Sequence, residues 1–130
     1  MTQAPELFSS ARTLLDRLSS GETSAVDLLD AHVARSEAVN PTVNAVVRND
    51  LGAARERARE LDRMQKAGTS AGPLHGLPIT IKDTFDVEGM PATSGAPEYA
   101  QPSGSSGLLC GVNPPRIGSF HDSDQLLTLS

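Results

Sequence analysis

The order of helical and extended segments predicts an α/β protein with an incomplete sheet. Three segments have the apolar spacing of amphipathic helices, and a buried strand at 77–82 follows the third of them. A shorter extended run at 43–47 lies between the second and third helices. Two strands do not make a sheet that buries both of its faces. The pattern therefore indicates that part of the fold is missing from these segments.

The composition limits the classes of function. The 130 residues suffice for one modest domain, and the net charge of −5 argues against nucleic acid as a partner. Cys110 is the single cysteine, which excludes an intramolecular disulfide and a cysteine metal cluster. We expect no cofactor and no bound metal.

The sequence also favours a particular setting for the protein. It has neither a secretory signal pattern nor an apolar run long enough to span a bilayer. We therefore expect a cytoplasmic protein with no membrane partner. The excess of Arg over Lys, together with abundant Ala, fits a GC-rich bacterial genome.

The first predicted helix covers residues 5–18 and ends at the Ser-Ser-Gly run 19–21. Its apolar stripe consists of Leu7, Ala11, Leu14 and Leu18. The second helix is predicted to start at Thr23 or Ser24. It is predicted to end at Asn40-Pro41, because the residue before a proline is pushed out of the helical region.

The third predicted helix covers residues 51–67 and follows two good N-cap residues, Asn49 and Asp50. Its outer face carries many charged side chains of both signs. This face is open to two interpretations, an anion-binding patch or a solvated surface with intrahelical pairs such as Asp62–Lys66. The mixed signs favour the solvated surface.

The strand at 77–82 carries the residue of greatest chemical interest. Ile79 and Ile81 fall on one face, whereas Thr80 and Lys82 fall on the other. A lysine held by a rigid apolar strand can be desolvated, which disfavours its ammonium form and allows it to act as a general base. The alternative is an ordinary lysine at a strand end, with its ammonium group in water.

The longer run GPLHGLPITIKD at 72–83 changes the weighting of these two interpretations of Lys82. Together with the turn residues Gly89-Met90-Pro91 and Thr93-Ser94-Gly95, it resembles the N-terminal signature of the amidase-signature family. The resemblance covers about residues 5–100. It implies that residues 1–100 form the N-terminal part of an amidase-signature α/β/α sandwich, with amphipathic helices and a lysine-bearing core strand.

The resemblance also implies a chemistry. Family members hydrolyse a carboxamide, or transfer its ammonia, with a Ser–cis-Ser–Lys triad. Lys82 corresponds to the family lysine, which takes a proton from the bridging serine. Asp83 points away from Lys82 by strand alternation and is expected to support the site structurally. His75 is expected to pack or hydrogen-bond rather than to act as a base.

The last part of the chain departs from this pattern. After about Ala100 the family's serine-bearing segment is not found, and residues 101–130 read as a divergent, irregular tail in which 125–130 can form a short element. Ser105 and Ser106 lie in a Ser/Gly run and are candidate nucleophiles of a compact triad. A flexible loop is the favoured interpretation of that run. The chain is thus expected to be a truncation, a frameshift product or a fragment.

The predicted function is that of an amidase-family hydrolase of carboxamide C–N bonds, seen as a truncated chain that is inactive alone. A small-molecule amide is the expected substrate of the complete protein. A transamidase subunit that releases ammonia is the alternative within the family. A non-catalytic interaction module and an inert gene product are the alternatives outside it. The sequence leaves the identity of the amide and the oligomeric state open.

Overall fold

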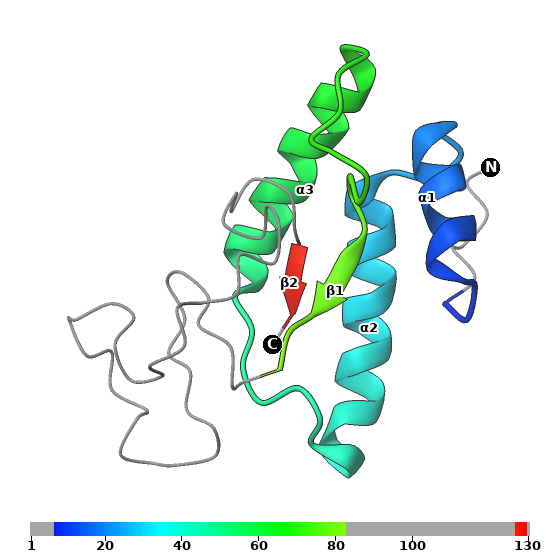
Figure 1. Cartoon of the computed structure of the whole chain (residues 1–130). Coiled ribbons are helices and arrows are strands. Elements are labelled where there is room, and N and C mark those ends of the chain that lie inside the picture. Colours follow the sequence, from blue (N-terminus) through cyan, green and yellow to red (C-terminus); the bar gives the residue numbers. More distant parts are fainter. Residues whose placement is uncertain (1–6, 83–126, 130) are drawn as a thin grey trace, which may run out of the picture. The chain divides into compact units, whose positions relative to one another are not determined.

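The computed structural model describes residues 7–82 and 127–129 (Figure 1). The chain divides into two compact units, one made of 1–80 with 124–130 and the other of 81–123. All described elements belong to the first unit. They are α1 (Ala11–Ser19), α2 (Ala25–Val43), α3 (Leu51–Lys66), β1 (Pro78–Thr80) and β2 (Leu127–Leu129). The three predicted helices and the strand that follows them are present, but β1 ends two positions before Lys82.

Helix α1 is shorter than predicted. Its N-cap is Ser10, whose Oγ accepts a hydrogen bond from the backbone N–H of Thr13 at 3.2 Å, so the helix begins at Ala11. The predicted stripe is right at Leu14 and Leu18, which are buried, but Ala11 is exposed. The helix ends at Ser19, as the Ser-Ser-Gly run predicts.

Helix α2 begins as predicted and ends later. Ser24 is the N-cap, and its Oγ accepts from the N–H of Asp27 at 3.0 Å. The predicted end at Asn40-Pro41 is wrong, because the helix continues through Pro41 to Val43. A proline removes one backbone hydrogen bond and restricts its predecessor, so the last turn needs other support.

That support comes from Asn40. Its side-chain Nδ2 donates to the Val46 carbonyl at 2.7 Å, and its Oδ1 accepts from the Val46 N–H at 2.8 Å. Asn44 adopts a left-handed conformation, with φ at +47°, and its N–H bonds to the Asn40 carbonyl. The extended run predicted at 43–47 is therefore wrong: Val43 closes the helix, and Asn44 turns the chain.

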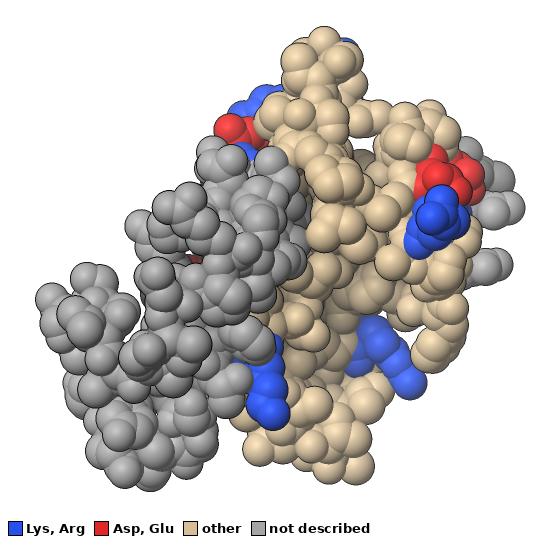
Figure 2. All heavy atoms as spheres, in the orientation of Figure 1, with Lys and Arg blue, Asp and Glu red and all other residues tan. Residues whose placement is uncertain are grey.

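Helix α3 matches its prediction closely. The Asp50 carboxylate caps it by accepting from the Ala53 N–H at 3.0 Å. On its outer face Arg57 pairs with Glu60 at 2.7 Å, and Arg59 pairs with Glu56 at 3.2 Å. The outer face of α3 thus carries ion pairs between side chains of opposite charge, as expected for a solvated helix surface. Figure 2 shows the described charged residues of the visible face scattered, without a continuous basic patch.

The predicted Asp62–Lys66 pair is wrong. The Asp62 carboxylate, on α3, instead accepts hydrogen bonds from backbone N–H groups at the start of α2. Its Oδ1 lies 2.7 Å from the nitrogen of Ala25, and its Oδ2 lies 3.2 Å from that of Val26. A charge-assisted bond to free helix N–H groups is stronger than an exposed ion pair.

The core lies where the three helices and the start of β1 meet. Leu28, Leu29 and Leu61 have no exposed surface, so α2 and α3 supply its centre. The other buried apolar residues are Leu14, Leu18, Ala25, Val33, Ala54, Ala58 and Leu77. β1 packs on α2, and β2 packs on α3 (Figure 1).

The predicted strand at 77–82 is present as the shorter β1. It pairs in parallel with β2, with Pro78 opposite Leu127 and Ile79 opposite Thr128. β2 thus lies in the predicted terminal element at 125–130. The predicted boundary near residue 100 stays a prediction, and the predicted irregular segment 101–124 lies outside the described residues. Among the described helices, none is long and apolar enough to cross a membrane.

Candidate functional site

The motif residues form a turn that leads into β1. The N–H of His75 bonds to the Gly72 carbonyl at 3.2 Å, and the N–H of Leu77 bonds to the Leu74 carbonyl at 3.1 Å. Gly76, between them, has φ at +77°, a conformation that favours glycine. A Cβ at Gly76 would lie 3.1 Å from the Ala25 Cβ, so the chain passes directly against α2 there.

His75 uses both of its ring nitrogens. Nδ1 accepts a hydrogen bond from the Ala71 N–H at 3.0 Å, and Nε2 lies 3.0 Å from the Leu61 carbonyl oxygen. Because an N–H only donates and a carbonyl only accepts, the ring proton lies on Nε2. The half-buried ring therefore hydrogen-bonds, as expected, and neither nitrogen is free to take a substrate proton. Its supporting role in catalysis stays a prediction.

Lys82 lies two positions beyond the last residue of β1. Burial along this segment follows the predicted alternation: Ile79 and Ile81 are half-buried, whereas Thr80 and Lys82 are exposed. In the described part of the chain, Lys82 is therefore exposed rather than enclosed by apolar side chains. Asp83 and the candidate nucleophiles Ser105 and Ser106 lie outside the described residues, so their roles stay predictions.

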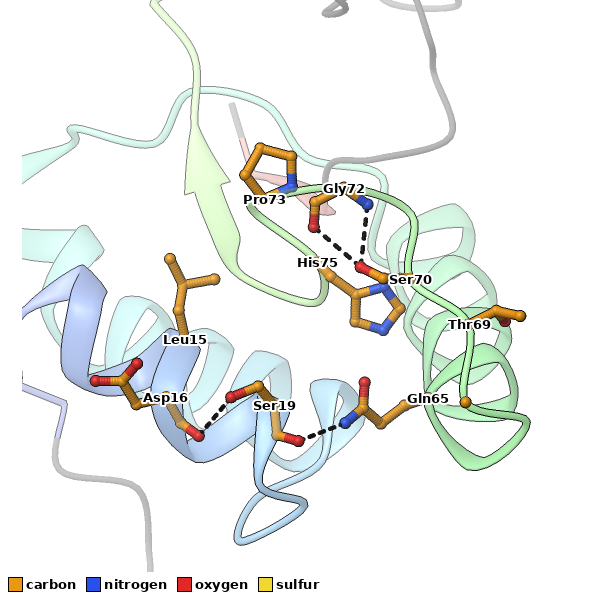
Figure 3. Close-up of a pocket in the computed structure, with 10 residues that line it drawn as sticks. Leu15, Asp16, Ser19, Gln65, Thr69, Ser70, Gly72, Pro73 and His75 are labelled. Atoms are coloured by element: carbon orange, nitrogen blue, oxygen red, sulfur yellow. Dashed lines mark hydrogen bonds between the residues drawn. The ribbon is translucent and has the colours of Figure 1, made fainter.

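A cleft of about 380 Å³ opens beside the turn (Figure 3). The Gln65 side chain crosses it and donates to the Ser19 carbonyl at 2.8 Å, which ties α3 to α1. The Ser70 Oγ bonds to both backbone groups of Gly72 along one wall. The remaining lining residues are Leu15, Asp16, Gly68, Thr69, Pro73 and His75.

This cleft was not predicted from the sequence. Its residues come from the ends of α1 and α3 and from the loop before β1, and no spacing in the sequence joins them. Within the ranges 7–82 and 127–129, no three His, Cys, Asp or Glu side chains are grouped closely enough to hold a metal ion.

The comparison with protein families decides which family this fold represents. The family model described as Amidase matches residues 27–105, more than half of the chain and the whole of the GPLHGLPITIKD run. The chain belongs to the amidase family. The predicted resemblance is thereby confirmed.

Curated relatives of this amidase-family chain carry several functional names. An acylamidase from Rhodococcus erythropolis is 34% identical over 140 residues, which cover 98% of this chain and 29% of the relative. An indoleacetamide hydrolase from Bradyrhizobium diazoefficiens is 44% identical over 65% of this chain and 17% of its own length. One subunit of the glutamyl-tRNA(Gln) amidotransferase from Streptomyces coelicolor is 40% identical over 66% and 17%.

The coverage of these alignments shows two things. The chain spans less than a third of the length of each of these relatives. The acylamidase alignment also runs well past residue 100, where we expected the resemblance to end.

Solved structures support the fold. A bacterial aryl acylamidase of the amidase-signature enzymes superposes with a TM-score of 0.70 and 29% identity, over 78% of this chain and 21% of that one. A structure from work on a vestigial protein complex and the origins of an s-triazine catabolic enzyme gives a TM-score of 0.69 and 27% identity. It covers 75% of this chain and 21% of the other. The predicted α/β fold of amidase-signature enzymes is confirmed.

Proposed function

We propose that this chain carries the catalytic lysine of an enzyme that cleaves the C–N bond of a carboxamide. The observation that supports this is the position of Lys82. It stands at the end of the GPLHGLPITIK run, inside the segment that matches the amidase family, and directly beyond the strand β1. Asp83 and His75 are proposed as supporting residues of the same site.

In the proposed mechanism, Lys82 in its neutral form accepts a proton from a bridging serine. The bridging serine in turn deprotonates the nucleophilic serine, whose oxygen attacks the amide carbonyl carbon. The resemblance assigns both serines to a segment downstream of Lys82. The proton is then returned to the leaving nitrogen, and water hydrolyses the resulting ester. Lys82 is exposed in the described residues, so the proposed role requires further chain packed around it.

The proposed substrate is a small-molecule amide, and hydrolysis is the proposed outcome. Acylamidase and indoleacetamide hydrolase among the relatives favour hydrolysis. Transfer of the released ammonia is a second candidate, favoured by the 40% identity to the amidotransferase relative. We also propose a bacterial, cytoplasmic protein, consistent with its bacterial relatives and its arginine-rich composition.

A chimera with a relative tests this proposal. The aligned segment of the Rhodococcus acylamidase is replaced by these 130 residues, and turnover of simple aliphatic and aromatic amides is measured for the chimera and for the chain alone. We expect turnover by the chimera, and only the rate of the buffer blank for the chain alone. Such a result follows if the chain supplies the base but not the nucleophile.

Two outcomes would count against this. A chimera that folds, as judged by circular dichroism and size-exclusion chromatography, yet cleaves no amide would contradict the proposed function. Turnover by the chain alone that disappears in both Lys82→Ala and Ser105→Ala would instead establish the compact triad. Ammonia appearing in a transfer product rather than free in solution would favour the second candidate.

A further inference from the structure

His75 ties two segments of the fold to each other. One ring nitrogen accepts from the Ala71 N–H in the loop after α3, and the other donates to the carbonyl of Leu61 in the middle of α3. Leu61 has no exposed surface, so its carbonyl belongs to the most rigid part of the core. The ring therefore fixes the loop to a fully buried part of α3.

The residues directly after His75 continue this docking. Gly76 passes within contact distance of α1 and α2, since a Cβ there would lie 3.3 Å from the Leu18 Cδ2. Leu77 is 7% exposed and belongs to the core. Three successive residues thus hold the chain on three helices immediately before Pro78 begins β1.

In a β-strand, the position and direction of the first residue largely determine the positions of the residues that follow. Each residue of a strand advances the backbone by about 3.3 Å in a nearly fixed direction. Lys82 follows Leu77 by only five positions, and β1 occupies three of them. A shift or rotation at the start of β1 is therefore carried along the strand to its last residue, Thr80.

We propose that His75 is a positioning residue: its bridge from Ala71 to the Leu61 carbonyl sets the position and direction of β1, the strand that ends two positions before Lys82. This inference rests on the proposed role of Lys82. An apolar side chain of similar size would fill the same space. It would leave the Ala71 N–H without its acceptor and would not fix the direction of the loop.

Amide hydrogen exchange on the 130-residue chain tests the bridge. His75→Phe keeps a ring of similar size and removes both hydrogen bonds. His75→Gln offers one acceptor and one donor on either side of one carbon, as the imidazole does. His32→Phe is the matched control, because among the described residues the half-buried His32 ring bonds to the Leu28 carbonyl of its own helix and to no second segment.

We expect His75→Phe to accelerate exchange at Ala71, Ile79 and Thr80 by at least about tenfold, with the core amides of α2 unchanged. We expect His75→Gln to recover much of this protection and His32→Phe to leave β1 as it is. A uniform rise in β1 and α2 would show that His75 only adds general stability. Unchanged exchange in β1 would overturn the inference outright.

The ring itself gives a second signature. Nitrogen-15 spectra of the neutral imidazole distinguish the two tautomers, and we expect His75 to carry its proton on Nε2. A proton on Nδ1 would contradict the bridge, because it would face the Ala71 N–H. Both measurements require no turnover, so a failed bridge is recognised separately from a failed role of Lys82.

Discussion

Asp62 provides the sharpest stability prediction, because one carboxylate caps a different helix from its own. Its two oxygens accept from the N–H groups of Ala25 and Val26 at 2.7 and 3.2 Å. Ala25 is 1% exposed, so its N–H has little access to water as a substitute partner. Asp62→Ala removes the acceptor and leaves the start of α2 uncapped on this side.

The magnitude follows from the kinds of bond involved. A hydrogen bond to a charged group contributes about 1.5–3 kcal/mol, and the favourable interaction with the helix dipole is part of that figure. The second bond is long, so we expect Asp62→Ala to lower the free energy of unfolding by about 2–3 kcal/mol. Asp62→Asn keeps one acceptor without the charge and should lose about 1 kcal/mol.

Chemical and thermal unfolding of the chain measure this directly. A loss of 2–3 kcal/mol corresponds to a fall in Tm of roughly 10–15 °C for a domain of this size. Asp30→Ala is the control, because within the described ranges the Asp30 carboxylate makes one exposed ion pair, with Arg55 at 2.8 Å. It should cost at most about 0.5 kcal/mol. Equal effects of Asp62→Ala and Asp30→Ala would refute the capping argument.

Three further predictions use the same unfolding assay. Gly76→Ala should lower the free energy of unfolding by about 2–4 kcal/mol, and Gly21→Ala by only about 1 kcal/mol. Both glycines have a positive φ, but only at Gly76 would the added Cβ meet neighbouring atoms. Similar losses in the two variants would contradict this. Leu61→Ala should lower the free energy of unfolding by about 2–5 kcal/mol, enough to unfold a marginal domain. A folded variant with an unchanged Tm would contradict the assignment of Leu61 to the core. Pro41→Ala should raise Tm by restoring a backbone donor inside α2, and a lower Tm would show that the proline favours the native turn.

Local signals explain which elements were predictable. The N-caps Ser24 and Asp50 act within three residues of themselves, and the apolar spacing of α3 is a property of the helix alone. Pro41 misled the prediction because its local preference is overridden by bonds between Asn40 and Val46. The predicted partner of Asp62 was wrong because its actual partners lie at the start of another helix. Spacing rules within one helix, such as i, i+4, do not predict such a contact.

In the candidate site, too, local features were predictable from the sequence, whereas features that depend on tertiary packing were not. Strand alternation correctly placed Ile79 and Lys82 on opposite faces. The partners of His75 were not predictable, since its ring reaches back to Leu61, fourteen positions earlier in the chain. The cleft beside Gln65 depends on how α1 and α3 end next to each other, which only the packed structure reveals.

The central claim is that Lys82 is the base of an amide-cleaving site. It is tested most directly by Lys82→Ala and Lys82→Arg in the acylamidase chimera, with Lys66→Ala as the control. Lys66 is the only other lysine and lies exposed on α3. We predict that both Lys82 variants lose most of the turnover, because a guanidinium does not give up its proton, whereas Lys66→Ala keeps it. Retained turnover in either Lys82 variant would contradict the claim.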